Sequence, residues 1–258
     1  MEKQKLKIAI ISLTGCEGCC FAILDWSKKF LALNKKIEVK NFRLFEEDAH
    51  FNTEKYDVAF VEGSPLTKAD IVRLRVIRNN SKKLIALGSC ADMGGIYHLK
   101  KYQDKNKIFN HVYKSEEEIP PDNNGSGIDN LEVLPISALV QVDGIIPGCP
   151  ITADEFFNLV YQFLIGKSAT IKQNPVCYEC QIQGFECLLQ KGEICLGPIT
   201  QGGCEAICLK SKQGCWGCRG LVEDAEVDNL VKKLKENYSE KEIIKVFEVF
   251  GVKEQINL

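Results

Sequence analysis

Cysteine is the residue type in this chain with the clearest capacity for chemistry, because the 258 residues include thirteen cysteines. Thirteen is an odd number, so the thiols cannot all pair as internal disulfides. The amino terminus, MEKQKLKIAIISL, has no small-residue cleavage site and no twin arginine, and it indicates a first strand instead of an export signal. In the cytoplasm that this implies, structural disulfides are uncommon. The thiols are therefore expected to bind metal or to carry electrons.

The cysteines form two groups along the chain. The first group is Cys16, Cys19, Cys20, Cys90 and Cys149, and the second is Cys177, Cys180, Cys187, Cys195, Cys204, Cys208, Cys215 and Cys218. A change of composition at residues 166–176 separates the groups. We therefore expect two domains, residues 1–168 and residues 169–258.

The first domain alternates short apolar runs with amphipathic stretches. Helical patterns fill residues 20–34 and the segments that follow Thr67 and Thr152, where Thr152 and Glu155 predict a capping box. This alternation predicts an α/β fold, a doubly wound parallel sheet with helices on both faces. The predicted strands are residues 7–13, 37–44, 57–61, 83–87 and 142–146, and the apolar face of the last helix is Phe156, Leu159, Val160, Phe163 and Leu164.

Four cysteines of the first group follow predicted strands. Cys16 and Cys19 come after the first strand, Cys90 after the fourth and Cys149 after the fifth, each beside glycine. Parallel strands end at one edge of a sheet, so the four thiols can converge on a metal site there. Helix starts after Cys19 and Cys149 would favour the thiolate form. A small buried residue, the usual role of a single cysteine, explains this pattern less well.

The second group has the eight thiols that two four-thiolate sites need. Cys177 and Cys180 with Cys215 and Cys218 resemble a zinc ribbon, although this arrangement leaves four cysteines for a second zinc. Iron–sulfur clusters also take four thiolates each, so the count alone does not separate the two metals. The segment is rich in glycine and would fold around its metals. Two short helices are predicted after Gly220, and Ser239 and Glu242 cap the second.

Four short segments and the cysteine-rich stretch resemble the small subunit of [NiFe] hydrogenases. The segments are GCEGC at 15–19, VEGS at 61–64, GSCADMGG at 88–95 and PGCP at 147–150. The stretch NPVCYEC…GEICLGPITQGGCEAIC…GCWGCRG is similar to the delta subunit of cytoplasmic, NAD(P)-linked, sulfhydrogenase-type enzymes. The resemblance covers residues 6–222, and it implies a flavodoxin-like domain followed by a small iron–sulfur domain with C-terminal helices.

The resemblance also implies three [4Fe–4S] clusters and assigns twelve ligands to them. Histidine and proline replace two of these cysteines in many membrane-bound and periplasmic relatives, but here Cys177 and Cys208 stand in those places. A medial cluster with a fourth thiolate is expected at a lower potential than a three-iron centre. The proximal ligands would be Cys16, Cys19, Cys90 and Cys149, the medial ligands Cys204, Cys208, Cys215 and Cys218, and the distal ligands Cys177, Cys180, Cys187 and Cys195.

The function implied is that of an electron-transfer subunit of a hydrogenase, with no catalytic residue of its own. It would relay electrons between the nickel–iron site of a large subunit, which covers the proximal cluster, and a flavin- and iron–sulfur-containing partner that reacts with NAD(P). Alternatives are another acceptor (heterodisulfide reductase or F420), a nickel-free oxidoreductase complex, or a zinc scaffold. No apolar run reaches the ~20 residues that span a bilayer, and a net charge of −2 argues against binding nucleic acid.

Several further residues carry weaker expectations. Cys20 is expected to pack in the first helix. The alternative is that Cys20 replaces Cys19 as a ligand, because the related subunit of respiratory complex I has an adjacent cysteine pair. Glu17 is expected to face solvent, the alternative being that it adds negative charge near the proximal cluster. Glu62 is expected to accept hydrogen bonds from loop amides or to help move protons. Two sets are expected at the surface: the histidines His50, His98 and His111, and the loop at residues 115–130.

Overall fold

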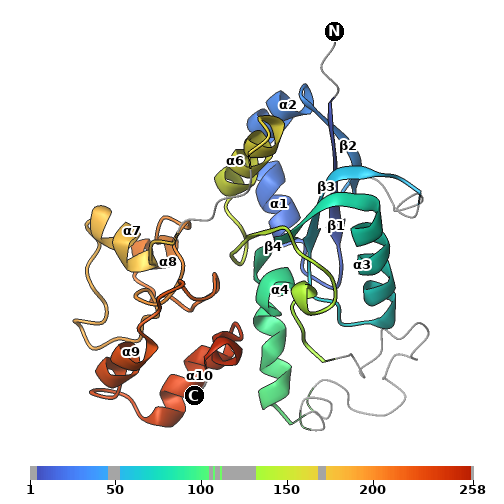
Figure 1. Ribbon diagram of the computed structural model, residues 1–258. Helices are drawn as coiled ribbons and strands as arrows, with labels where there is room; N and C mark the ends of the chain where they lie inside the picture. The colour runs from blue at the N-terminus through green and yellow to red at the C-terminus, as the bar shows by residue number, and fades with distance from the viewer. Residues whose placement is uncertain are drawn as a thin grey trace.

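A five-stranded parallel sheet forms the first part of the molecule, as the sequence predicts (Figure 1). The computed structural model describes residues 5–45, 53–104, 107, 111, 132–167 and 173–256. The strand order β2-β1-β3-β4-β5 is the flavodoxin-like, doubly wound arrangement, which confirms the predicted fold class. The strands are β1 (Leu6–Ser12), β2 (Ile37–Phe42), β3 (Tyr56–Glu62), β4 (Ser81–Leu87) and β5 (Gly144–Ile146).

Helices cover both faces of this sheet because successive strand residues point to opposite sides. Ile8 and Ile10 of β1 pack into the core beneath α1 (Gly18–Asp25), α2 (Ser27–Asn34) and α6 (Ala153–Leu164). Ala9 and Ile11 face the other core, which contains Leu74 and Ile77 of α3. The remaining elements here are α3 (Lys68–Asn80), α4 (Gly88–Met93) and the 3-10 helices η1 (Gly95–Tyr102) and η3 (Ile136–Ala138).

Two local predictions in this part are wrong. The helix expected over residues 20–34 is two helices, α1 and α2, that meet at Trp26. The capping box at Thr152 does not form, although those at Thr67 and Ser239 are present. The Thr152 hydroxyl instead donates to the Glu155 carboxylate over 2.8 Å. That carboxylate also accepts a hydrogen bond from Arg219 of the second part, so it is turned away from the start of the helix.

The second part consists of short helices joined by long loops. Its first core contains three buried cysteines, with two more packed against them, and the apolar residues Val176, Leu188 and Leu209. Its second core includes Phe247 and Val252, and also Met93 from α4, so the C-terminal helices pack against the first part. The expected boundary at 168/169 lies outside the described residues. The elements are α7 (Val176–Ile182), α8 (Ile207–Lys210), α9 (Val227–Leu234), α10 (Glu240–Glu248) and η4 (Val252–Gln255).

Two of the three histidines lie in the described residues, and their surroundings differ. His98 was expected at the surface but is only 2% exposed, and its Nε2 lies 2.8 Å from the carbonyl oxygen of Met93. Burial lowers its pKa. A Cβ on Gly251 would lie 2.2 Å from the imidazole, so the C-terminal turn closes directly on this ring. His111 is exposed as predicted, whereas His50 and the loop at 115–130 lie outside the described residues.

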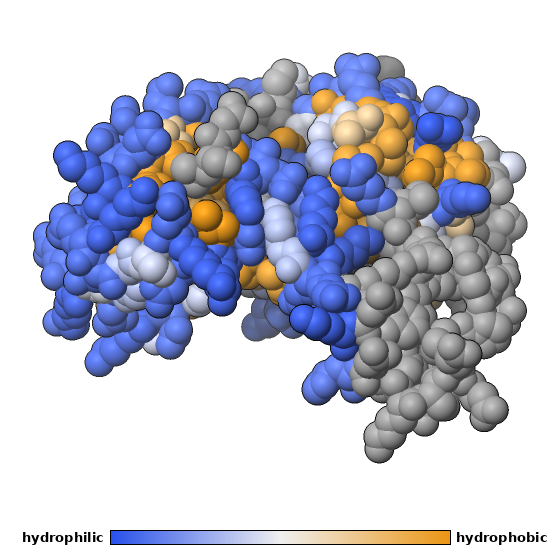
Figure 2. Space-filling view, turned by 90° about the horizontal axis from the view of Figure 1, so that it is seen from below, coloured by the Kyte–Doolittle hydropathy of each residue, from blue (hydrophilic) through white to orange (hydrophobic). Residues whose placement is uncertain are grey.

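The outer surface is mostly hydrophilic in the view from below (Figure 2). Apolar patches interrupt it, one of them on the side where Figure 1 places α9 and α10. None of the helices in the described ranges is long and apolar enough to cross a membrane.

Phe156 of α6 provides a test of this packing, because its side chain is fully buried and its ring centroid lies 4.8 Å from that of Phe60. We expect Phe156→Ala to reduce the free energy of unfolding by about 3–5 kcal/mol, since the substitution leaves a cavity in the core. The measurement is the unfolding temperature of the anaerobically purified protein. Asn158→Ala, at an exposed position of the same helix, should leave that temperature almost unchanged. Equal shifts for both variants would show that α6 is not anchored through Phe156.

Candidate functional site

The four cysteines of the predicted proximal site lie together at the carboxyl edge of the sheet. Cys16 lies in the turn after β1, Cys19 in the first turn of α1, Cys90 in α4 after β4, and Cys149 in the loop after β5. The thiols lie close enough to affect one another's ionisation, since charge on Cys90 and Cys149 raises the pKa of Cys19, and charge on Cys16 raises that of Cys90. The structure therefore brings together the four residues of this set, called here the proximal quartet.

Glycines give the sulfur atoms of the proximal quartet room beside the backbone. A Cβ on Gly88, where φ is +82°, would lie 2.4 Å from the Cys19 Sγ. A Cβ on Gly95, where φ is +56°, would lie 3.1 Å from the Cys90 Sγ. Only glycine fits the first position without displacing the thiol, and both backbone conformations favour it. The backbone therefore approaches these two sulfurs closely.

Burial opposes ionisation of these thiols, contrary to the effect expected from the helix starts. The backbone amides of Ile151 and Ile96 donate to Cys19 and Cys90 and favour their thiolates. Desolvation outweighs both: it raises the pKa of Cys90 to about 12 and that of Cys19 further above its usual range. A bound cation would stabilise the thiolates at neutral pH, and its binding would release protons.

The second set, called the distal quartet, lines a small cavity of its own. Cys177 and Cys180 lie on α7, Cys187 follows that helix, and Cys195 begins the next loop. All four thiols reach this cavity, together with Leu188 and other apolar residues. Burial and the charge on Cys195 raise the pKa of Cys177 to about 11.

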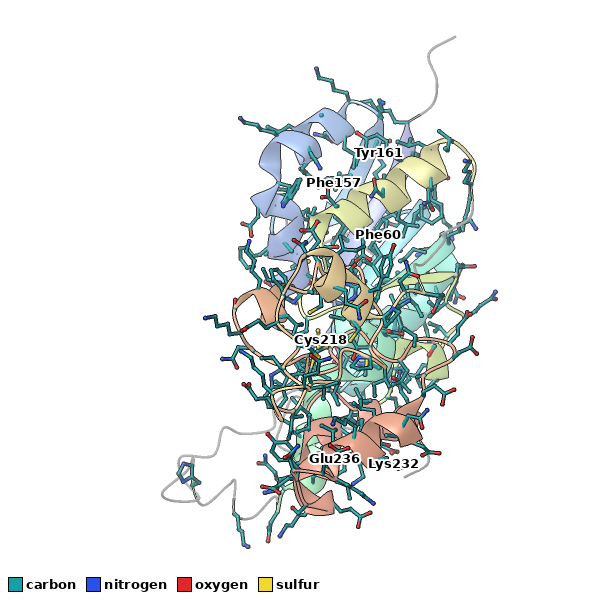
Figure 3. All side chains as sticks on the ribbon, turned by 90° about the vertical axis from the view of Figure 1, so that its left-hand side faces the viewer. Phe60, Phe157, Tyr161, Cys218, Lys232 and Glu236 are labelled. Carbon is teal, nitrogen blue, oxygen red and sulfur yellow. The ribbon has the colours of Figure 1, made fainter. Side chains whose placement is uncertain are left out.

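The third set, called the medial quartet, surrounds the α8 turn. Cys204 and Cys208 lie on either side of its start, and Cys215 and Cys218 follow it. The four line a larger cavity of about 1100 Å³, and Cys149 of the proximal quartet lines the same cavity. Burial raises the pKa of Cys218 to about 12, with further contributions from Cys204 and Cys208. Figure 3 shows sulfur atoms gathered around Cys218, below the aromatic core at Phe60 and Phe157.

Backbone contacts link the quartets in series. The backbone of Cys149 in the proximal quartet lies close enough to Cys218 in the medial quartet to lower the pKa of its thiol. The amide of Cys215 in the medial quartet donates to the Sγ of Cys195 in the distal quartet over 3.3 Å. The medial quartet therefore contacts both of the others through the backbone of cysteine residues.

Each quartet offers a set of four thiols, which fits both a [4Fe–4S] cluster and zinc. Over the ranges that the structure describes, no group of three or more Cys, His, Asp or Glu side chains has the arrangement of a site for a single metal ion. The close approach of glycine backbone to sulfur and the amide–sulfur hydrogen bonds fit a cluster, whose sulfurs accept such bonds.

Glu62 and Cys20 form a buried polar contact behind the proximal quartet. Glu62 is 2% exposed, and its carboxylate accepts hydrogen bonds from the Ser12 hydroxyl over 3.2 Å and from the Cys20 amide over 3.1 Å. Burial raises the pKa of Glu62. The Cys20 side chain is fully buried in the core of the sheet, the position expected of a packing residue. These bonds hold the first turn of α1 against the end of β1.

Glu17 is not simply solvated. It precedes α1 with φ at 60°, and its carboxylate pairs with the Nε of Arg43 over 3.0 Å. Its side chain is 26% exposed, so both solvent and the guanidinium offset its charge beside the proximal quartet.

Two charged residues next to the quartets were not predicted from the sequence. Arg219, which directly follows Cys218, is 1% exposed and pairs with Glu155 of α6 over 2.7 Å. Glu179 lies between Cys177 and Cys180, and its carboxylate accepts a hydrogen bond from the Gly203 amide over 2.6 Å. Arginine and glutamate are mostly exposed, so composition gave no reason to single them out. The sequence feature that could have singled them out is their position next to the predicted cysteine ligands.

The roles of Cys19 and Cys20 can be separated by substitution. We expect Cys19→Ala to lose metal from the proximal quartet, because charge on Cys90 and Cys149 acts on its thiol. Cys20→Ala should keep that metal, because its thiol points into the core toward Ser12, at 3.7 Å. The measurement is the metal content of each anaerobically purified variant. Loss of metal in Cys20→Ala alone would reverse the assignment.

Comparison with known proteins identifies the family. The family described as the 20 kDa subunit of NADH ubiquinone oxidoreductase matches residues 16–163. The delta subunit of sulfhydrogenase 2 from Pyrococcus furiosus is 35% identical over 247 residues, which cover 95% of this chain and 99% of that protein. A subunit of the F420-non-reducing hydrogenase vhu from Methanocaldococcus jannaschii is 31% identical, and the match covers 84% of this chain and 83% of that one.

A solved structure extends the comparison to the fold. A chain of an NAD⁺-reducing [NiFe] hydrogenase in the H2-reduced state has a TM-score of 0.55 and 26% identity, and the match covers 65% of this chain and 95% of that one. The chain therefore belongs to the family of the NADH ubiquinone oxidoreductase 20 kDa subunit and, within it, to the small subunits of hydrogenases.

Proposed function

We propose that this chain is the electron-transfer small subunit of a hydrogenase and holds three [4Fe–4S] clusters. The observation that carries the proposal is the arrangement of twelve cysteines in three neighbouring quartets, with the Cys149 backbone beside Cys218 and the Cys215 amide hydrogen-bonded to Cys195. The clusters, when bound, accept and donate single electrons. Under this proposal, electrons from the nickel–iron site of a large subunit enter at the proximal quartet, pass to the medial quartet and leave from the distal quartet.

The protein's own residues hold the clusters and set their potentials. Thiolates of the three quartets supply the ligands, and backbone amides donate to their sulfurs, such as those of Gly197 and Cys215 to Cys195. These bonds stabilise the negative charge that reduction adds, so each raises the potential of its cluster. Burial acts in the opposite direction, because it disfavours added charge.

A medial cluster with four thiolates suits a low-potential acceptor. Cys208 lies in the medial quartet and lines its cavity with Cys204, Cys215 and Cys218, so the donor set is complete for four irons. Cluster type and charge set the potential, and a four-iron centre here is expected to lie below a three-iron one. This favours exchange with a nicotinamide, through a flavin- and iron–sulfur-containing partner in the cytoplasm.

The exposure of the quartets supports the placing of the partners. Cys16 and Cys149 are exposed at the edge of the sheet, where a large subunit would cover them. Cys187 of the distal quartet is also exposed, and Tyr178 and Ile182 of α7 are 51% and 69% exposed beside it. An apolar surface next to the last cluster fits a contact with the acceptor subunit.

A second candidate differs only in the acceptor. The similarity to the F420-non-reducing hydrogenase subunit extends over 84% of this chain, whereas the NAD⁺-reducing structure matches 65% of it. The cysteine-rich second part is therefore compatible with a heterodisulfide reductase or another acceptor in place of NAD(P). Two measurements on the native complex distinguish these acceptors. The first identifies the subunits that co-purify with the chain, and the second assays the reduction of NAD(P), F420 and disulfides. A large subunit without nickel would instead indicate a nickel-free oxidoreductase.

Metal analysis tests the cluster count directly. We expect the anaerobically purified chain to be brown and to contain about 12 iron and about 12 acid-labile sulfide, four of each per cluster. Zinc in place of iron would contradict the proposal.

The direction of the relay can be tested in the complex. Cys149→Ala should remove the proximal signal and stop H2-driven dye reduction while the other two clusters remain. Cys187→Ala is the matched variant at the other end: it should remove the distal signal and leave the proximal cluster reducible by H2. Full H2-driven turnover in Cys149→Ala would contradict the assignment of the proximal quartet.

A further inference from the structure

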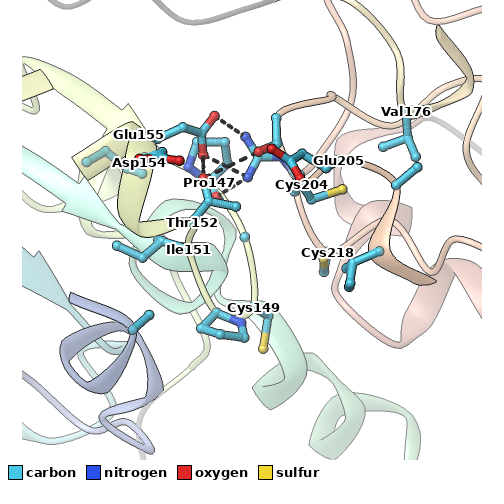
Figure 4. A pocket seen from close by; sticks show the side chains of 18 of the residues that line it. Pro147, Cys149, Ile151, Thr152, Asp154, Glu155, Val176, Cys204, Glu205 and Cys218 are labelled. Atoms are coloured by element: carbon cyan, nitrogen blue, oxygen red, sulfur yellow. Dashed lines mark hydrogen bonds and ion pairs between the residues drawn. The ribbon is translucent and has the colours of Figure 1, made fainter. Parts of the chain in front are cut away.

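We propose that Arg219 and Glu155 form a positioning pair that fixes the separation of the proximal and medial clusters. This inference rests on the proposed function, because it concerns two of the clusters assigned there. The pair lies between the two parts of the molecule, with Glu155 on α6 and Arg219 in the loop that carries the last cysteine. Figure 4 shows Glu155 with Cys204, Cys149 and Cys218 around the cavity, and dashed lines mark its hydrogen bonds.

All three nitrogens of the buried guanidinium are hydrogen-bonded. Both terminal nitrogens donate to Glu155, Nη2 to Oε1 over 2.7 Å and Nη1 to Oε2 over 3.0 Å. Nη1 also donates to the carbonyl oxygen of Pro147 over 2.7 Å, and Nε donates to those of Gln201 and Gly202 over 3.1 and 3.0 Å. The planar geometry of arginine permits this set of bonds, whereas a lysine ammonium could not make it.

These bonds join three segments that carry cluster ligands. Pro147 lies two residues before Cys149 of the proximal quartet, and Gly202 lies two residues before Cys204 of the medial quartet. Arg219 itself follows Cys218. One side chain therefore ties the proximal ligand loop to two medial ligand segments.

The fit around the pair leaves little room for adjustment. A Cβ on Gly203 would lie 2.2 Å from the Glu155 Oε1 and 2.3 Å from the Arg219 Nη2. A Cβ on Gly148 would lie 3.3 Å from the Arg219 Nη1. Glycine in both ligand loops thus allows the ion pair to contact their backbones directly.

The pair holds the proximal and medial ligand loops against each other. The Cys149 backbone lies close enough to Cys218 to lower the pKa of its thiol, and this proximity depends on the position of residues 147–149 relative to residue 218. Arg219 fixes both ends, through its bond to Pro147 and through its own place in the chain. When the pair is disrupted, the two ligand loops can separate while each cluster keeps its four thiolates.

Magnetic coupling between the reduced proximal and medial clusters measures this separation independently of turnover. We expect Glu155→Gln and Arg219→Lys, studied in the purified complex, to lose the wild-type splitting of the proximal signal while retaining about 12 iron. Glu155→Gln keeps the shape of the side chain, so it provides the decisive variant where Arg219→Lys does not fold. Asp154→Asn is the matched control: Asp154 is the neighbouring carboxylate on α6, and its ion pair with Lys29 is exposed.

The outcomes separate this inference from the proposed function. Wild-type splitting in Glu155→Gln, or in a folded Arg219→Lys, would overturn the positioning role, since the pair would then not set the separation. Loss of splitting in Asp154→Asn as well would also overturn it, because the effect would not be specific to the pair. Absence of the three cluster signals from the wild-type complex would instead refute the proposed function.

Discussion

The cost of burying negatively charged sulfur governs this structure. Desolvation raises the pKa of most of the cysteines in the three quartets, including Cys215 and Cys218 deep in the second part. Backbone amides, and Arg219 beside Cys204, offset only part of that cost in the described residues. A bound cation would offset more of it. The polypeptide contributes amides aimed at sulfur, such as those of Ile151 and Gly197, and space beside the backbone. Folding and metal binding are therefore coupled, most strongly where the chain has little apolar core of its own.

The two parts of the molecule meet this constraint in different ways. In the first part a rigid parallel sheet places three strand ends at one edge, and the ligands need only extend from them. In the second part, short helices such as α7 and α8 hold some ligands while loops carry the others. The first site is thus positioned by secondary structure, and the other two depend on hydrogen bonds between loops, such as the one from Cys215 to Cys195.

Periodicity and cysteine spacing were sufficient to predict the doubly wound parallel sheet and the convergence of Cys16, Cys19, Cys90 and Cys149, whereas the flavodoxin-like arrangement came from the family resemblance. They were sufficient because each signal is local: a strand is apolar, and a ligand follows its end. The failures involve long-range contacts. Glu155 has the spacing of a capping residue, but its carboxylate instead accepts hydrogen bonds from Arg219, which is distant in sequence. His98 has no local apolar pattern, and the C-terminal turn at Gly251 buries it. The partition of eight cysteines into two sites likewise needed the fold or the family.

The core that α4 shares with the C-terminal helices bears on how firmly the proximal quartet is held. Met93 lies three residues after Cys90 and packs with Phe247 and Val252. Because a closely packed core transmits displacement, a disturbance near Val252 reaches the helix that carries Cys90. The C-terminal helices therefore add to the rigidity of the proximal quartet as well as stabilising the second part.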